Sequence, residues 1–407
     1  MKITSVEISV FELPMHPAVT QLISVGHPSE YRWQQAFPKG NQVPVQVMQV
    51  MTDEGVNGIC TVGDWRYTEL TQRQINQLRE LVIGEDPLDR KLLLSKLKAV
   101  SRFFEPGWFG GFDNCLWDIE GKVKNLPVSA LLGGAKEKIQ AYYNTAGNTT
   151  EELIRDGESG IEAGFTVLKD HLPFGAIKNI ENFRKFRNVF GDKIGLMHDA
   201  ALVNYTFEEA LMVGEELEIL NFIWLEEPLP DRHHEDYVNL CRNLNIPVAG
   251  AETLMNEPEI SELWLTSGAI DILRVNGRHG TTPILHASKF AARLGTTVEP
   301  NAYGPLFGIV HAHIDCGIEN IGWFENAPPI NGAAMGEEIG LLNPIRPIRG
   351  WVTPPDGPGW GSQWDWKRFK SKRIASLRNR TTISRLPTYK INHPGVLFNK
   401  SRVYFHS

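Results

Sequence analysis

Three carboxylates follow short apolar runs at nearly equal intervals along the chain. Asp199, Glu226 and Glu252 are separated by 27 and 26 residues, which is about the length of one β/α unit. Equivalent positions on neighbouring parallel strands lie at one edge of a sheet, where three carboxylates would repel one another unless a cation neutralised them. Oxygen ligands, without Cys or His at those positions, select a hard ion, and we expect Mg²⁺. Taken singly, each acid could instead cap the next helix or pair with an arginine.

Two further charged residues end predicted strands of the same series. Lys169 ends the run that begins at Phe165, and Glu325 ends the run that begins at Asn320. A β/α barrel builds its active site at the carboxyl ends of its strands. We therefore expect Lys169 and Glu325 to lie near the three carboxylates.

The elements that must position these residues are apolar runs that alternate with polar-faced helical segments. The runs cover residues 139–143, 165–169, 194–199, 222–226, 247–252, 270–275, 296–300 and 320–325. Strands that alternate with helices indicate parallel strands joined by crossovers, and eight of them predict a closed β/α barrel. A doubly wound open sheet is the alternative, but no Gly-x-Gly-x-x-Gly motif follows an early strand to support its nucleotide-binding form.

The region before the barrel predicts mixed α and β structure. Strand-like runs cover residues 3–11, 43–51 and 56–62, and helical stretches run from about 70 to 100 and from about 111 to 123. The Pro/His/Gly-rich stretch from Pro14 to Gly40 is too long for an ordinary connection, and we interpret it as a functional flap or a disordered segment.

The chain after the barrel changes character twice. After Pro328 it is rich in Pro and Gly, which predicts an extended returning segment and no new domain. Beyond Trp366 the chain carries 11 basic residues and no acid. We expect a solvated or partly disordered tail, and a role in binding nucleic acid or membranes is the alternative.

Composition excludes several classes of protein. The 407 residues carry 41 Lys and Arg against 48 Asp and Glu, a formal charge of −7, so there is no global basic field to hold nucleic acid. Four scattered cysteines argue against a zinc module and a disulfide framework. Glu7 and Glu12 interrupt the amino terminus where a signal peptide needs an apolar run, and no apolar stretch reaches the ~18 residues of a membrane helix. We expect a cytoplasmic homo-oligomer with no nucleic-acid or membrane partner.

The motifs around the three acids resemble those of a known family. Leu196-Met-His-Asp-Ala, Trp224-Leu-Glu-Glu-Pro and Pro247-Val-Ala-Gly-Ala-Glu are similar to the metal-ligand motifs of the enolase superfamily, in its branch of enzymes like mandelate racemase and muconate lactonizing enzyme. Asp118 to Lys122, followed by Leu126-Pro-Val-Ser-Ala-Leu-Leu-Gly-Gly, resembles the helix that leads into the family's barrel.

The resemblance implies a fold and a division of the chain. The fold is α/β, a (β/α)₇β modified TIM barrel with an amino-terminal α+β capping domain. We expect the cap over residues 1–130, the barrel over 131–345, a segment returning to the cap over 346–375 and the basic tail over 376–407. The stretch from Pro14 to Gly40 would then be a mobile flap, and Gly63 to Glu69 a second specificity loop.

The resemblance also implies chemistry, in which Mg²⁺ assists removal of the proton next to a carboxylate through an enediolate; this pairing is known for the superfamily. The family's Lys-x-Lys motif reads Lys169-Asp170-His171 here, and strand alternation sends Lys169 and His171 to one face. Lys169 matches the lysine nearer the substrate carboxylate, and His171 takes the place of the proton-abstracting lysine. The charge of Lys169 should keep His171 neutral near pH 7. Alternatively, His171 is a loop histidine with a structural hydrogen bond.

Opposite this pair the branch has a His-Asp dyad, and the sequence departs from it at both positions. Asn276 stands at the Asp position and Asn301 at the His position. Asn cannot take a proton but can donate to an oxyanion. His279 is the alternative base if the alignment is shifted by a few residues.

Glu325 matches the eighth-strand glutamate, which acts as an acid or hydrogen-bonds to the substrate. Alternatively it pairs with Lys169 or Arg274. For the substrate, a small-molecule carboxylate, we expect further contacts from Arg274, Asn301, His27 and Tyr31.

A single base favours elimination over two-base racemisation. His171 would take the proton, and a β-hydroxyl would leave. The resemblance therefore implies a lyase that dehydrates a sugar acid to a 2-keto-3-deoxy acid. An epimerase, racemase or cycloisomerase using the same enediolate is the alternative enzyme. A non-catalytic sugar-acid-binding protein with a degenerate site is the alternative of another class.

Overall fold

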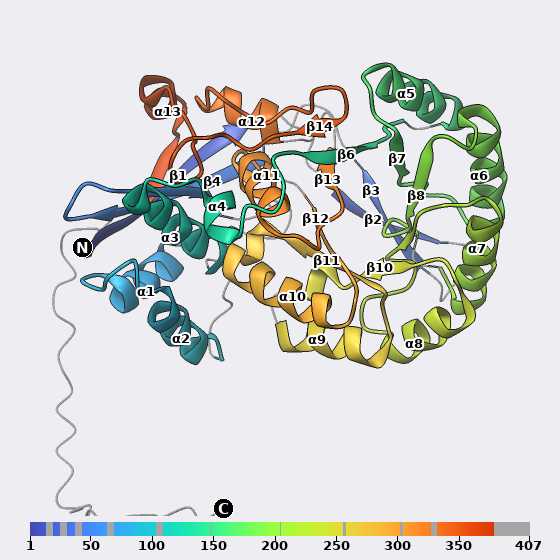
Figure 1. The fold of residues 1–407 in the computed structure, drawn as a ribbon, viewed down its shortest axis with the longest axis horizontal. Helices are drawn as coiled ribbons and strands as arrows, with labels where there is room; N and C mark the ends of the chain where they lie inside the picture. The colour runs from blue at the N-terminus through green and yellow to red at the C-terminus, as the bar shows by residue number, and fades with distance from the viewer. Residues whose placement is uncertain are drawn as a thin grey trace, which may run out of the picture.

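The structure, a computed structural model, has a cap beside a ring of strands and helices (Figure 1). The residues that it describes are 1–13, 19–24, 31–36, 43–62, 69–102, 109–147, 149–203, 205–254, 258–301, 304–326 and 332–377. Of residues 19–24 and 31–36 only the backbone is described. Among the described helices none is both long and apolar enough to cross a membrane.

The cap is an antiparallel sheet covered by helices. Its strands, in spatial order, are β15 (Ala375–Leu377), β1 (Ile3–Leu13), β4 (Val43–Thr52) and β5 (Gly58–Thr61). The helices are α1 (Gln72–Val82), α2 (Arg90–Ser101) and α3 (Phe109–Lys124). Apolar side chains such as Val6 and Ile8 of β1 and Leu78 of α1 are fully buried between the sheet and the helices.

The helical stretch predicted from 70 to 100 is wrong in one respect, because it is two helices. α1 begins at a capping box formed by Thr71 and Gln74 and ends at Val82. Gly84 then adopts a φ of 84°, a left-handed conformation that only glycine takes without strain. A new N-cap at Asp89 starts α2, so the chain reverses between the two helices.

The long stretch from Pro14 to Gly40 contains a hairpin. Strands β2 (Val19–Ser24) and β3 (Tyr31–Ala36) pair in antiparallel register, with Val19 opposite Ala36 and Ser24 opposite Tyr31. The rest of the stretch, including His27, and residues 63–68 of the predicted second loop lie outside the described residues.

The predicted barrel with a cap is confirmed. Its strands among the described residues are β6 (Ile139–Asn144), β7 (Val167–Asp170), β8 (Gly195–Asp199), β9 (Leu225–Glu226), β10 (Val248–Gly250), β11 (Ile272–Asn276), β12 (Val298–Asn301) and β13 (Phe324–Asn326). They are parallel and follow the order β12-β11-β10-β9-β8-β7-β6-β13. Neighbours in sequence are thus neighbours in space, unlike the reversed order of a doubly wound sheet.

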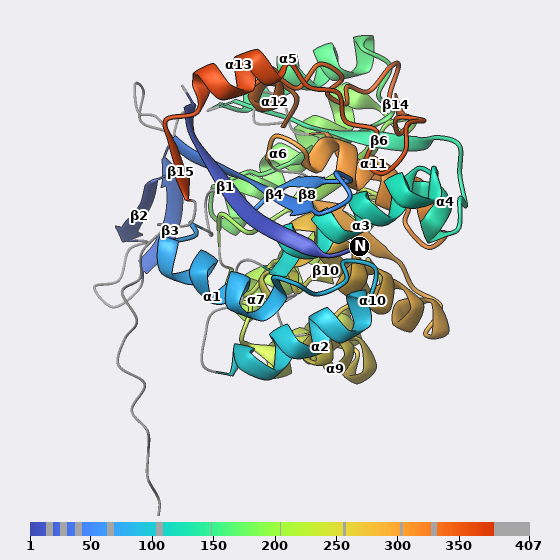
Figure 2. The same ribbon diagram turned by 90° about the vertical axis from the view of Figure 1, so that its left-hand side faces the viewer.

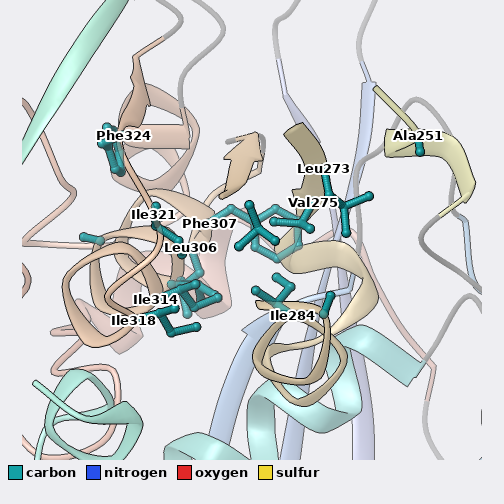
Figure 3. Close-up of a cluster of buried hydrophobic side chains, with 14 of the residues drawn as sticks. Ala251, Leu273, Val275, Ile284, Leu306, Phe307, Ile314, Ile318, Ile321 and Phe324 are labelled. Atoms are coloured by element: carbon teal, nitrogen blue, oxygen red, sulfur yellow. The ribbon is translucent and has the colours of Figure 1, made fainter. Parts of the chain in front are cut away.

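Helices cover the outside of these strands (Figure 1). They are α5 (Thr150–Glu162), α6 (Ala176–Phe190), α7 (Phe207–Ile219), α8 (His234–Asn243), α9 (Pro258–Ser267), α10 (Thr281–Arg293) and α11 (Phe307–Gly317). Figure 3 shows the layer between strands and helices, in which Leu273 and Val275 of β11 lie near Ile284 of α10 and Phe307 of α11. Because strand side chains alternate, the residues between these apolar ones, such as Arg274, face the barrel interior.

The ring closes at the seam between β12 and β13. The amide of Val298 donates to the carbonyl of Asn320 (3.1 Å). The carboxylate of Glu299 accepts from the amides of Gly322 (3.1 Å) and Trp323 (3.1 Å). Polar contacts, including a buried acid, therefore hold the seam.

A lysine ties the chain before β6 to the chain before β13. Nζ of Lys136 donates to the backbone carbonyls of Ile318 (2.8 Å), Glu319 (2.9 Å), Ile321 (2.8 Å) and Asp315 (3.3 Å). Four carbonyl oxygens thus surround one ammonium group at the amino-terminal side of the barrel.

The segment after the barrel crosses back to the cap (Figure 2). It contains α12 (Gly332–Glu338), β14 (Trp351–Val352) and α13 (Trp366–Lys372). β14 pairs antiparallel with β6, and β15 pairs antiparallel with β1. Residues 378–407, which hold most of the predicted basic tail, lie outside the described residues.

Helix α3 joins the cap, the barrel and this returning segment. The buried carboxylate of Asp118 accepts from the amides of Ile59 in β5 (3.0 Å) and Trp360 (3.0 Å). Nδ2 of Asn114 donates to the carbonyl of Gly277, just after β11 (2.8 Å). Side chains of one helix thus bond all three parts of the molecule.

Candidate active site

The inward side chains at the carboxyl ends of the barrel strands form one polar cluster. The strands deliver them because every second residue faces the interior. From the described strand ends the cluster includes Tyr142, Asn144, Lys169, Asp199, Glu226, Arg274, Asn276, Asn301 and Glu325, all of them buried.

Lys169 lies at the centre of the cluster. Its Nζ is 3.1 Å from Oδ2 of Asp199, 3.0 Å from Oε2 of Glu226 and 3.5 Å from Oε1 of Glu325. Burial alone would lower the pKa of Lys169, but the carboxylates, Glu226 and Glu325 foremost, raise it well above its ordinary value. Lys169 is therefore a permanent cation among acids, as expected beside a carboxylate-binding site.

Arg274 is a second interior cation. Its Nε is 2.7 Å from Oε1 of Glu226, and its Nη2 is 2.6 Å from Oε2 of Glu325. The side chain is 0 % exposed, and its two ion pairs are with carboxylates of the protein. The expected contact between Arg274 and the substrate remains a prediction.

Glu325 pairs with both cations, as the alternative interpretation held. It also accepts from the hydroxyl of Tyr142 (2.8 Å) and from Nδ2 of Asn144 (2.7 Å). Burial would raise the pKa of Glu325, but Lys169 and Arg274 outweigh it and lower the pKa to about 2. Such a carboxylate carries no proton near pH 7, which favours pairing with Lys169 and Arg274 over the expected role as an acid.

His171 faces the cluster from just beyond β7. Its Nε2 is 3.0 Å from Oδ2 of Asp199, and its side chain is 28 % exposed. Burial would lower the pKa of His171, but the carboxylate of Asp199 outweighs both burial and Lys169 and raises it. In the chain without a cation on Asp199, this carboxylate therefore favours the imidazolium form of His171 more strongly than Lys169 disfavours it.

The two asparagines at the dyad positions lie together and contact the third predicted metal ligand. Nδ2 of Asn276 donates to Oδ1 of Asn301 (2.8 Å). Nδ2 of Asn301 donates to both carboxylate oxygens of Glu252 (3.1 and 3.0 Å). Nη1 of Arg278 lies 3.2 Å from Oε1 of Glu252. In this structure the asparagine pair orients a carboxylate.

His279, the alternative base, lies beside this group on the short 3-10 turn Gly277–His279. Its Nε2 accepts from Nε of Arg278 (3.2 Å), and burial together with the charge of Arg278 lowers its pKa well below the ordinary value. His27 lies outside the described residues, and so does the side chain of Tyr31 in β3, so their expected substrate contacts remain predictions.

Tyr142, Asn144 and Arg278 belong to the site, although no motif singled them out. Tyr142 and Asn144 alternate along the first predicted strand, and the same parity that placed Lys169 would have placed them inward. Arg278 had no such signal, because it follows the strand on a turn. Glu227 is a fourth site residue that the motifs did not single out. Its φ is 46°, and its buried Oε1 has no hydrogen-bond partner among the described residues.

The donor set fits a hard divalent cation. Asp199 and Glu226 end β8 and β9, Glu252 opens the 3-10 turn Glu252–Leu254 just after β10, and all three offer only oxygen ligands. Burial, followed by the charge of Glu252, raises the pKa of Glu227 well above its usual range. Negative charge is thus in excess here. Within the described residues no three His, Cys, Asp or Glu side chains are arranged as metal ligands. Asp199 and Glu226 contact Lys169, and Glu252 accepts from Asn301. A cation would compete with these contacts.

Two family descriptions match the chain. One is the "Enolase C-terminal domain-like" family, over residues 152–368. The other is the "Mandelate racemase / muconate lactonizing enzyme, N-terminal domain", over residues 20–133. The chain belongs to this family of the enolase superfamily. Membership confirms the resemblance seen in the motifs around Asp199, Glu226 and Glu252.

Individual members agree with the expected reaction class. The chain is 31% identical to the arabinonate dehydratase of Saccharolobus solfataricus over 78% of its own length and 88% of that protein. It is 26% identical to the L-talarate/galactarate dehydratase of Salmonella typhimurium, over 78% and 80%. A solved D-glucarate dehydratase from Agrobacterium tumefaciens, complexed with magnesium, superposes with a TM-score of 0.78 at 26% identity, over 92% of this chain and all of that one. The mandelate racemase-like chain is a lyase of the dehydratase type.

Proposed function

We propose that the chain is a Mg²⁺-dependent dehydratase that converts a sugar acid into a 2-keto-3-deoxy acid. The observation that carries the proposal is the pairing of Lys169 with His171 on one side of the site and of two asparagines on the other. Among the residues named, His171 is both able to move a proton and accessible at 28 % exposure. Relatives that act on arabinonate, talarate, galactarate and glucarate support a sugar acid as substrate.

The residues would divide the work as follows. Lys169, held as a cation, binds the substrate carboxylate and favours the negative charge that develops there. His171 takes the proton from C2, and the C2–H electrons form the enediolate. Mg²⁺, held by Asp199, Glu226 and Glu252, would supply stabilisation of the same negative charge.

Elimination then completes the reaction with the same imidazole. The enediolate electrons form the C2–C3 double bond, the C3 hydroxyl leaves, and the proton on His171 goes to the leaving oxygen, so that one water is lost. The enol tautomerises to the 2-keto acid. His171 serves both steps because Glu325, with its pKa near 2, has no proton to give. Asn301 and Asn276 donate hydrogen bonds and take no proton.

The test is incubation of the purified protein and Mg²⁺ with a library of sugar acids in D₂O. Accumulation of a 2-keto acid supports the proposal. Deuterium at C2 without loss of water would instead support epimerisation. Binding of a sugar acid with neither outcome would support a non-catalytic binding protein, and would contradict the dehydratase.

A further inference from the structure

Two neighbouring barrel strands end in the same two residue types in opposite order. The chain reads Asp170-His171 at the end of β7 and His198-Asp199 at the end of β8. Asp170 is paired with His198 in the parallel register, so each histidine meets the aspartate of the other strand. Inside the barrel His171 Nε2 lies 3.0 Å from Asp199 Oδ2, and outside it His198 Nδ1 lies 2.7 Å from Asp170 Oδ1.

The outer pair continues into a buried chain of hydrogen bonds. Nε2 of His198 lies 3.1 Å from the hydroxyl of Tyr205, and that hydroxyl accepts from Nδ2 of Asn179 on α6. Because a carboxylate only accepts, His198 carries its proton on Nδ1, which leaves Nε2 to accept from Tyr205. Phe183 of α6 contacts the edge of the imidazole at a centroid distance of 4.6 Å. Asp170, His198 and Asn179 are 4 %, 0 % and 0 % exposed.

Both ends of this chain hold the loop that carries His171. The amide of Leu172, the next residue, donates to Oδ1 of Asp170 (3.1 Å). Nδ2 of Asn179 shares its two N–H groups among the hydroxyl of Tyr205 and the carbonyls of Leu172 (3.1 Å) and Phe174 (3.0 Å). The amide and the carbonyl of the residue beside His171 are therefore both fixed from outside the barrel.

We propose that Asp170, His198, Tyr205 and Asn179, the outer relay, are positioning residues for His171. None of them needs to touch the substrate. The outer relay fixes the backbone on which the imidazole stands, and it pins the register of β7 against β8 at the step where His171 faces Asp199. This inference rests on the proposed function, in which His171 moves the proton.

The test compares Tyr205→Phe with Tyr143→Phe. Tyr205→Phe removes the donor to His198 and the acceptor for Asn179. Tyr143 of β6 lies in the same layer outside the barrel, and its hydroxyl donates to Asp156 (3.3 Å) without contact to the loop of His171. We expect Tyr205→Phe to lower kcat about 10-fold, because small displacements of a reacting group are costly. The KM and the Mg²⁺ affinity should stay within about twofold, and the deuterium isotope effect on kcat with C2-labelled substrate should rise. Tyr143→Phe should change none of these.

Asp170→Asn is the second variant, in case Tyr205→Phe folds poorly. It keeps an acceptor for the amide of Leu172 but removes the carboxylate that orients His198, and we expect the same fall in kcat at unchanged KM. Equal kcat for wild type and both variants overturns the outer relay. If the wild type has no turnover at all, the proposed function fails, and hydrogen exchange at the amide of Leu172 then decides. Exchange in Tyr205→Phe as slow as in wild type overturns the outer relay.

Discussion

Two buried cations balance the acids inside the barrel. Lys169 touches Asp199, Glu226 and Glu325, and Arg274 joins the last two of these from the other side. Charges removed from water are tolerated only when they are paired and hydrogen-bonded. The interior of this barrel is therefore held in shape by charge pairs as much as by apolar contacts.

Removal of Arg274 tests this balance. Arg274→Met should lower the free energy of unfolding by about 3–5 kcal/mol, because Glu226 and Glu325 would lose their shared buried partner. Urea denaturation followed by circular dichroism measures the change. Arg346→Met is the matched control, since it breaks the exposed pair with Glu337 and should cost about 1 kcal/mol or less. Equal losses in the two variants would contradict the role of Arg274.

Replacement of His171 tests the assignment of the base. His171→Asn should lower kcat by about 10²–10⁴-fold, the usual contribution of a general base. Mg²⁺ binding, measured by titration calorimetry, should persist because Asp199, Glu226 and Glu252 are intact. His233→Asn serves as the control, since that histidine is 54 % exposed and pairs with Asp236 away from the cluster. An active His171→Asn enzyme would show that another group moves the proton.

At the scale of elements, strand ends were predictable from sequence, and side-chain partners were not. Asp199, Glu226 and Glu325 lie at the predicted strand ends because apolar runs and parity specify where a strand stops and which face a residue takes. The alternation of side chains along a strand does not specify which partner each side chain contacts. That Arg274 turns to Glu226, and that Asp199 outweighs Lys169 in setting the pKa of His171, depends on distances that only the assembled barrel defines. The single helical stretch predicted from 70 to 100 passes over Gly84 and Pro87, the two residues with turn preference at the break between α1 and α2.

The seam between β12 and β13 predicts a dependence of stability on pH. Burial raises the pKa of Glu299 to about 7, above the ordinary value of 4.5. Between about pH 4.5 and about pH 7, Glu299 therefore binds more protons in the folded chain than in the unfolded chain. Its contribution to the free energy of unfolding falls as the pH rises through this range. Glu299→Gln, which cannot ionise, should be more stable than wild type at pH 8, by up to about 3 kcal/mol, and nearly equal to it at pH 4.5.

Denaturant titrations at pH 4.5 and pH 8 measure this difference. Glu319→Gln is the control, because Glu319 is an exposed acid near the same seam and should show no such trend. A gain from Glu299→Gln that is the same at both pH values would contradict ionisation as its cause.

At the scale of the whole molecule, α3 makes the cap and the barrel one unit. Asp118 bonds the amides of Ile59 and Trp360, and Asn114 bonds the carbonyl of Gly277. The three parts that these bonds join lie far apart in the sequence. We therefore expect cap and barrel to unfold together, with coincident near- and far-ultraviolet circular dichroism transitions.

Asp118→Ala should weaken this joint. Two buried amides would lose their acceptor, which should lower the free energy of unfolding by roughly 3 kcal/mol. Asp86→Ala is the control, because Asp86 is exposed and, among the described hydrogen bonds, its carboxylate accepts only from the amide of Leu88. A loss no greater than that of the control would argue that Asp118 does not join the parts.

Four backbone carbonyls converge on the ammonium group of Lys136. Carbonyl oxygens arranged in this way can also coordinate an alkali ion. Because this cation is covalently part of the chain, it is supplied at a constant effective concentration. We therefore expect the closure of the ring beneath β6 and β13 to need no potassium or sodium ion from the solution.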